Sequence, residues 1–484
     1  MKWSPSHLLV LIAFGVTAPA VHAQTVGSNE VYLGQTGDTN TITIDQEGLD
    51  NVIGELDELF RLNQVGDLNE VVATQYGYDN SVGSRLRSGS YVSNGLNQIG
   101  DRNLLTINQV NKTASSFNRI EAIRQRSLEG RATTANVIDI NQNDTGGVAG
   151  HSIGQVVQVN ETGAGSANTT TILQTGGSLA GGNTVEQTLQ SGAGNDINIE
   201  QRNFGNEVRT VTQLGSENIL DVDEYGSGNF LDIVEQNNAV TGNAGNRASL
   251  RFDSDDNGRS DVAGVSGFGD RFVAAMRPGQ AAVMQLGSDN TLSYVAASGP
   301  NNLYGFLQEG VGNGINVVTA GTANEAAVAQ FGDGNIASIN QIGDDNIGGV
   351  LQLGESGTAD IQMGGDKNVA MIEQDGAYNR ATIKITGHRN NSDDAGGFSG
   401  KLLTASLSSG LSAGLLSQVG SNNAAQLDVT GDDNLFAVMQ HGAGNSVVGT
   451  VVGMANQALV VQSGDANFVN FTQTGDRNSL LVVQ

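Results

Sequence analysis

The chain has 484 residues, with 67 Gly, 4 Pro and no Cys, and 50 acidic against 23 basic residues give a net charge of −27. Fifty Asn and 32 Gln make carboxamides a large class, whereas only 15% of the residues are charged. The lack of Cys excludes a disulfide scaffold, Cys-ligated metal centres and a thiol nucleophile. The acidity argues against nucleic acid as a partner, because phosphates require a basic surface.

The first 23 residues have the pattern of a secretory signal peptide. Lys2 supplies the positive charge, Leu8 to Val16 form an apolar run, and small residues precede Gln24. A helix that spans a bilayer needs about 20 apolar residues, so this run is too short to be an anchor. No later segment of the sequence is long enough either. We therefore expect a secreted or surface-attached protein without a transmembrane segment.

An internal repeat occupies most of the remaining chain. The string Gln-x-Gly-x-x-Asn occurs sixteen times, and the complementary string Asn-x5-Gln also occurs sixteen times. Together they give a period of 11 residues, which is unbroken from Gln418 to Gln484. An Asn/Gln-rich disordered tract would not keep this phase. The first string begins at Gln35, Gln46, Gln64, Gln75, Gln98, Gln190, Gln213, Gln285, Gln308, Gln330, Gln341, Gln374, Gln418, Gln440, Gln462 and Gln473.

Each unit has the pattern of one short strand and one turn. In a strand, every second residue points to the same face. In the unit from Asn40 to Gln46 that face carries Asn40, Ile42, Ile44 and Gln46, so two apolar side chains point inward between two amides. The Gly of the connecting segment suits a sharp turn with positive φ. Paired acids in these turns, such as Asp344 with Asp345, are expected to be solvated.

Two such units close one coil of about 22 residues. Coils stacked in parallel at ~4.8 Å place Asn over Asn and Gln over Gln, so that each buried amide donates to one neighbour and accepts from the other. The fold class that we predict is all-β: a flattened parallel β-solenoid, amyloid-like, with two strands per coil and loop insertions.

The regularity of the repeat varies along the chain and defines its organisation. The expected segments are the signal peptide 1–23, N-terminal repeats 24–110, less regular repeats 111–236, an insertion with an acidic loop 237–284, regular repeats 285–390, a second insertion 391–417 and regular C-terminal repeats 418–484. Insertions are expected to project from one side of a solenoid.

The units resemble the curlin repeat, whose pattern joins Ser-x5-Gln-x-Gly-x-x-Asn to a second inward strand that ends in Gln. Residues 324–352 and 434–484 match it best, with Asn in place of the leading Ser. The resemblance implies a subunit of curli-type extracellular amyloid fibres that serves biofilm matrix and adhesion. It also implies self-association as a homopolymer, export through an outer-membrane secretion pore and nucleation at the cell surface. The chain is several times longer than a five-repeat curlin, so major subunit, nucleator and stand-alone adhesin stay open.

One acidic segment has the spacing of a calcium loop. Asp253, Asp255, Asn257 and Asp261 place oxygen ligands at positions 1, 3, 5 and 9, and Gly258 is at position 6. The bidentate Glu of the twelfth position is missing, so a solvated acidic turn is the alternative. No cofactor is required by this interpretation, and Ca²⁺ is the one candidate.

Catalytic chemistry has little support in the sequence. The three His residues of the mature chain, His151, His388 and His441, are far apart and lack metal-ligand spacing. Parallel β-helix enzymes such as polysaccharide lyases need a cleft with acidic and basic groups, which no cluster suggests. The only basic concentration, Arg119, Arg124, Arg126 and Arg131, could meet an anionic polysaccharide or form a locally balanced surface. We therefore expect a protein that is not an enzyme.

Two functions of different classes remain. The first is a self-assembling fibre subunit, and the second is a monomeric calcium-binding solenoid that acts as a surface adhesin or ligand-binding protein. Soluble solenoids need polar caps. The first unit begins at Asn29 and the last ends at Gln484, which leaves no room for a cap and favours the fibre.

Overall fold

The computed structural model describes residues 29–54, 62–83, 95–112, 117–130, 133–144, 150–161, 165–176, 181–238, 244–258 and 281–484. The predicted signal peptide lies outside these residues. The chain divides into two compact units, Met1–Gly245 (unit 1) and Asn246–Gln484 (unit 2), and each is described by itself. Among the described residues, no helix has the length and apolar character needed to cross a bilayer.

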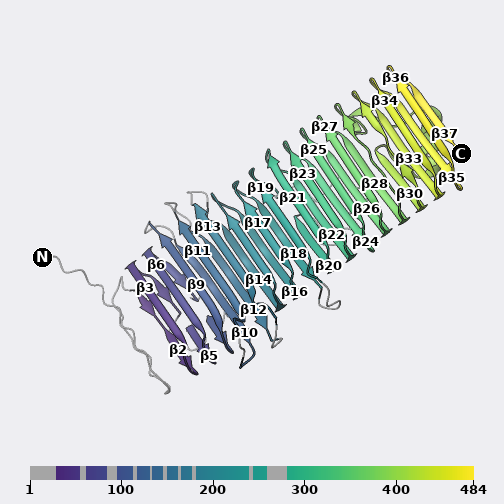
Figure 1. The fold of residues 1–484 in the computed structure, drawn as a ribbon. Coiled ribbons are helices and arrows are strands. Elements are labelled where there is room, and N and C mark those ends of the chain that lie inside the picture. Colours follow the sequence, from purple (N-terminus) through teal and green to yellow (C-terminus); the bar gives the residue numbers. More distant parts are fainter. Residues whose placement is uncertain are drawn as a thin grey trace. The chain divides into compact units, whose positions relative to one another are not determined.

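Unit 2 consists of two parallel sheets, and the chain passes from one to the other at each turn (Figure 1). Sheet A contains β20 (Ala282–Ser288), β22 (Leu303–Val311), β24 (Glu325–Phe331), β26 (Ile347–Glu355), β28 (Val369–Ala377), β30 (Leu415–Ser421), β33 (Leu435–Ala443), β35 (Gln457–Ser463) and β37 (Ser479–Val483). Sheet B contains β19 (Arg247–Phe252), β21 (Thr291–Ser298), β23 (Gly314–Ala320), β25 (Ile336–Ile342), β27 (Thr358–Gly364), β29 (Ile385–Thr386), β31 (Ala424–Ala425), β32 (Asp428–Thr430), β34 (Ser446–Val452) and β36 (Phe468–Thr474).

The register of unit 2 follows the repeat. In sheet A, Gln330 of β24 lies beside Gln352 of β26, and in sheet B Ile339 of β25 lies beside Ile361 of β27, in both cases 22 residues apart. All of these pairings are parallel. Two strands per coil of 22 residues therefore confirm the predicted parallel β-solenoid.

The core of unit 2 lies between the two sheets. Val328 of sheet A and Ile339 of sheet B are at most 1% exposed, as are the other inward apolar residues of these coils. Around β19, β21 and β22 four buried aromatic rings replace the small aliphatic residues. The rings of Tyr294 and Tyr304 have their centroids 4.7 Å apart, and Phe252 and Phe306 lie against them. Aromatic packing of this kind adds to the stabilisation from buried area.

Unit 1 has the same two-sheet arrangement. Its sheet A contains β1 (Glu30–Val31), β2 (Leu33–Thr36), β4 (Val52–Ile53), β5 (Leu62–Val65), β7 (Asn80–Val82), β8 (Leu96–Ile99), β10 (Asn118–Ser127), β12 (Ser152–Asn160), β14 (Thr184–Ala193), β16 (Glu207–Ser216) and β18 (Phe230–Asn237). Its sheet B contains β3 (Thr41–Leu49), β6 (Glu70–Tyr78), β9 (Asn103–Asn111), β11 (Asn136–Asp144), β13 (Asn168–Gly176), β15 (Asp196–Gln201) and β17 (Ile219–Glu224).

The coils of unit 1 differ in length, although their strands stay in register. Stacked Gln residues of sheet A are between 23 and 34 residues apart, because extra residues are accommodated in the turns. The segment 111–236, expected to be less regular, contributes consecutive strands to both sheets. Gln125 and Gln158 lie in line with the other Gln residues, although neither begins a Gln-x-Gly-x-x-Asn string. A tolerant turn is invisible to a search for a fixed period.

The two expected insertions differ from a plain loop. Residues 244–258, within the expected insertion 237–284, include strand β19, which pairs with β21 as part of the solenoid. This part of the segment was wrongly interpreted, because its strand lacks the Gln that marks the repeat. The insertion 391–417 contains the 3₁₀ turn η1 (Asp393–Ala395) and the helix α2 (Gly400–Ser409), and its last residues begin β30.

Candidate functional site

The most extended feature of unit 2 is a row of stacked Gln side chains in sheet A. Each Nε2 donates to the Oε1 of the Gln in the next coil at 2.7–3.2 Å. The second N–H of each amide is also used: Gln330 Nε2 donates to the carbonyl of Gly314, which begins the next strand of sheet B, at 3.0 Å. We call this row the Gln ladder of sheet A. Its members are Gln285, Gln308, Gln330, Gln352, Gln374, Gln418, Gln440, Gln462 and Gln484.

Asn side chains form a second kind of ladder at the entrance to each strand. Asn346 donates from its backbone N and its Nδ2 to Asn324 Oδ1, both at 3.1 Å, and its Nδ2 also donates to the carbonyl of Gly365 at 2.8 Å. Each Asn thus donates towards the preceding coil, whereas each Gln donates towards the following one. Because every buried amide finds partners in its neighbours, the stack avoids the cost of unsatisfied polar groups. The sequence predicted the ladders but not these opposite directions.

The ladder is interrupted where the residue type changes. Gly357 lies at an Asn position and provides only its N–H, which donates to Asn335 Oδ1. In unit 1, His151 lies at an Asn position: its N donates to Asn118 Oδ1, and its Nδ1 accepts from the N of Asn183. Its Nε2 lies 3.3 Å from the carbonyl of Asn143. Burial lowers the pKa of His151, so the neutral ring with a proton on Nε2 fits this environment.

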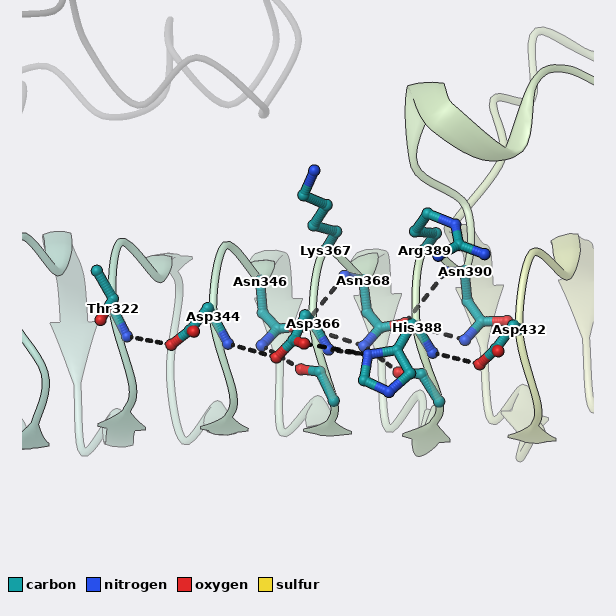
Figure 2. Close-up of polar contacts among 12 residues, drawn as sticks. Thr322, Asp344, Asn346, Asp366, Lys367, Asn368, His388, Arg389, Asn390 and Asp432 are labelled. Carbon is teal, nitrogen blue, oxygen red and sulfur yellow. Dashed lines mark hydrogen bonds and ion pairs between the residues drawn. The ribbon is translucent and has the colours of Figure 1, made fainter.

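The turns carry a third row of contacts, shown in Figure 2. Asp344 Oδ1 accepts from the backbone N of Thr322 at 2.7 Å, and Asp366 Oδ1 accepts from the N of Asp344 at 3.0 Å. His388 continues the row, since its Nδ1 accepts from the N of Asp366 at 3.1 Å and its N donates to Asp432 Oδ1 at 2.9 Å. The turn acids were expected to be merely solvated. They also bind the preceding coil.

A close approach of backbones accounts for the turn glycines. Gly343 has φ of 116°, which favours Gly, and a Cβ at this position would lie 2.2 Å from the carbonyl oxygen of Gly365 in the next coil. A second positive φ precedes the Asn, as at Asp345 with 57°. The sequence predicted the first conformation. It did not predict the contact between turns, which depends on how closely the coils stack.

The candidate calcium ligands do not converge in the described residues. Asp253 is exposed and its Oδ1 accepts from Arg251 Nε at 2.8 Å. Asn257 is fully buried as the first member of an Asn ladder, and its Oδ1 accepts from the N and Nδ2 of Asn302. Asp255 is exposed, and Asp261 lies outside the described residues. Within the part of the chain that the structure describes, no group of three or more His, Asp or Glu side chains is placed to hold a metal ion.

The remaining candidates from the sequence are also dispersed. His151 is buried in unit 1, whereas His388 and His441 lie in turns of unit 2. In the Arg group, Arg119 and Arg126 form ion pairs with Glu121 and Glu161, at 3.6 and 2.6 Å. Arg131 lies outside the described residues. These contacts agree with the interpretation of a locally balanced surface.

No protein-family model matches the chain, and a search of curated proteins gives no significant match. The surfaces described above are therefore interpreted from their own chemistry, which is that of coil stacking: backbone groups, amide ladders and turn carboxylates.

Proposed function

We propose that the protein is a secreted structural subunit that assembles with further copies of itself into extracellular amyloid-like fibres of the curli type, which serve biofilm matrix and surface adhesion. The observation that carries the proposal is the Gln ladder of sheet A. Each step joins two coils through an amide that is both donor and acceptor, so a coil can receive an identical partner. The contact between two coils of one chain therefore has the same chemistry as the contact that would join two chains.

The spacing of the coils supports a common rule for stacking within and between chains. Sheet A of unit 2 keeps a 22-residue register over most of its steps, and its side chains repeat at the same heights in each strand. A segment with this spacing needs no special residue to dock on another. Parallel strands that present backbone N–H and C=O groups template the addition of further strands.

A test can be made at strand β37. It pairs with β35, and among the described residues no strand pairs with its other side. Leu480 and Val482 point inward, in register with Ala458 and Val460, whereas Ser479 and Val483 are exposed on the outer face. Replacing both inward residues with Lys would place two ammonium groups where a docking coil must bury them, at a cost of several kcal/mol each.

We expect Leu480→Lys with Val482→Lys to slow fibre growth strongly, as measured by sedimentation and amyloid-dye fluorescence after dilution of purified mature protein from denaturant. The matched control is Ser479→Lys with Val483→Lys, which adds the same charge to the outer face of the same strand and should assemble normally. A wild-type protein that stays monomeric for days at micromolar concentration would refute the proposal. Such a result would favour the alternative function, a monomeric surface adhesin.

In this proposal the protein performs no catalysis and requires no cofactor. Export through an outer-membrane pore and nucleation at the cell surface belong to the same proposal, since they follow from the resemblance to curlin repeats. They can be tested separately from assembly, by comparing secretion of the chain with and without residues 1–23.

A further inference from the structure

The outer face of sheet A in unit 2 carries apolar side chains that are buried although they point away from the core. Leu307 of β22, Ala329 of β24 and Leu351 of β26 are 2%, 0% and 4% exposed and form one cluster. In sheet B, by contrast, the outward Val448 in the middle of β34 is 38% exposed. A sheet cannot bury the middle of its own outer face. Another part of unit 2 must therefore cover β22, β24 and β26.

Sheet A shows what such a cover looks like further along the chain. Phe398, Leu402 and Leu411, from the segment that contains α2, pack on Leu435 and Ala437 of β33 and on Leu459 of β35, and α2 also contacts β37. Ser399 anchors this segment, since its N and Oγ both lie 3.1 Å from Gln457 Oε1 at the start of β35. We call residues 392–413 the described cover.

A second segment of the same length occurs at the equivalent place in the repeat. Asn390 and Gln418 are 28 residues apart, where an ordinary unit has 6, and Asn257 and Gln285 are also 28 residues apart. Both pairs bracket 22 additional residues between an Asn ladder and a strand of sheet A. The two segments also agree in sequence at a constant offset: Asp261, Gly264, Ser266 and Gly267 correspond to Asp394, Gly397, Ser399 and Gly400.

The geometry of the two segments relative to the strands is the same. The described cover precedes β30 and lies on the next three strands of sheet A, β33, β35 and β37. Residues 259–280 precede β20, and the next three strands are β22, β24 and β26, which carry the buried apolar cluster. Within unit 2, residues 259–280 are also the only ones outside the described set.

We propose that the outer face of β22, β24 and β26 is an internal docking surface, and that its occupant is the segment 259–280 of the same chain. Val265 then takes the place of Phe398 on the apolar cluster. Ser266 takes the place of Ser399 and meets Glu325, which begins β24 as Gln457 begins β35. The proposal assigns Asp261 to this cover, at the position of Asp394, rather than to a calcium loop.

The proposal is tested by thiol labelling, which is clean because the chain has no Cys. Ala329→Cys should react slowly in the full mature chain. It should react at least about tenfold faster when residues 259–280 are deleted, since a buried thiol reacts only when its cover opens. The deletion restores the ordinary spacing of 6 between Asn257 and Gln285, so the solenoid is expected to stay folded. Labelling is done on freshly diluted monomer, so the result does not depend on fibre formation.

The described cover supplies the matched controls. Ala437→Cys, which is also 0% exposed, should become reactive when residues 392–413 are deleted and stay protected when residues 259–280 are deleted. Equal labelling of Ala329→Cys with and without residues 259–280 overturns the proposal. If the deletion exposes Ala437→Cys as well, the unit has unfolded, and crosslinking of the full chain decides instead.

In that crosslinking experiment a short bismaleimide joins two introduced thiols within one chain. Ser266→Cys with Glu325→Cys should crosslink as efficiently as Ser399→Cys with Gln457→Cys, whose parent side chains are in contact. Ser266→Cys with Ile342→Cys, on the exposed outer face of sheet B, should not crosslink. Failure of the first pair under conditions in which the second reacts overturns the proposal.

Discussion

Units 1 and 2 stack the same kind of coil but differ at the ends of their sheet B strands. In unit 1 these positions form a second Gln ladder: Gln75, Gln109, Gln142, Gln174 and Gln201 are linked, and the row reaches Glu224. In unit 2 the corresponding positions are mostly apolar: Phe252, Ala296, Thr319, Gln341, Met363, Ile385, Val429, Val451 and Gln473. Both solutions fill the same place in the coil.

The difference shows that the value of a buried amide depends on its neighbours in the stack. Gln142 accepts from Gln109 and donates to Gln174, whereas Gln341 lies between Thr319 and Met363. The Oε1 of Gln341 is buried and has no hydrogen-bond partner among the described residues. A continuous ladder satisfies its members, and a continuous apolar run needs none. An isolated amide gains less, because a buried oxygen without a donor costs about 1–3 kcal/mol.

The turns differ in the same sense. Unit 2 keeps its turns short and in contact, while unit 1 accommodates extra residues there. The largest predicted effect therefore concerns a turn glycine. Gly343→Ala in unit 2 places a Cβ 2.2 Å from the carbonyl oxygen of Gly365 and forces a non-Gly residue to φ of 116°, so we expect a loss of more than about 3 kcal/mol.

The control for this prediction is a glycine of unit 1 in open space. Gly130 has φ of 77°, and a Cβ there would meet nothing within 4 Å. Asn tolerates this conformation, so Gly130→Asn should change the stability by less than about 1 kcal/mol. Denaturant midpoints of the two variants measure the difference. Equal midpoints would show that stacking of turns contributes nothing.

The second prediction breaks one ladder and spares the other sheet. Gln142→Met in unit 1 leaves the Nε2 of Gln109 without its acceptor and the Oε1 of Gln174 without its donor, which should cost about 2–4 kcal/mol. Gln341→Met in unit 2 removes an amide whose oxygen is already unpaired, and its cost should stay near 1 kcal/mol. If both variants lose the same stability, the ladder is not cooperative.

The third prediction concerns pH and is confined to unit 1. Because burial lowers the pKa of His151, the unfolded chain binds the proton more readily than the folded one, and stability is lost as the pH falls below about 6.5. Asp144, which favours the protonated ring, opposes this effect without reversing it. His151→Asn restores the residue type of the ladder and should remove this component of the pH dependence. Unfolding curves between pH 5 and 8 compare the two proteins; identical slopes would contradict the assignment.

The smallest predicted effect concerns an ion pair in unit 2. Arg389 donates from Nε and NH2 to the two carboxylate oxygens of Asp433 at 2.8 Å, and this bond lowers the pKa of Asp433. Its contribution is therefore present above about pH 4 and is lost as the pH falls through the lowered pKa. The pair is largely exposed, so Arg389→Gln should have a slight effect that 1 M salt abolishes. A large, salt-independent loss would contradict this.

How far the sequence predicts the structure differs between the units for a physical reason. In unit 2 the 22-residue coil leaves one ladder position per strand, and Gln330 or Asn346 can be assigned from the string alone. In unit 1 the turns vary in length, and residues such as Gln125 join the ladder without the string. His151 at an Asn position has no signal in the sequence, because only its place in the stack shows its role. The covers on sheet A also escaped a search for inward apolar residues, since their contacts lie on the outer face.

X-ray diffraction from aligned fibres of the mature protein tests the central claim, which is that copies of the chain add coil to coil. The account predicts a sharp meridional reflection at ~4.8 Å, parallel to the fibre axis, from strands stacked perpendicular to that axis. It further predicts that Leu480→Lys with Val482→Lys forms few fibres, while Ser479→Lys with Val483→Lys forms fibres with the same reflection. An absence of the meridional reflection in well-aligned fibres, or normal fibres from the inward double variant, would contradict it.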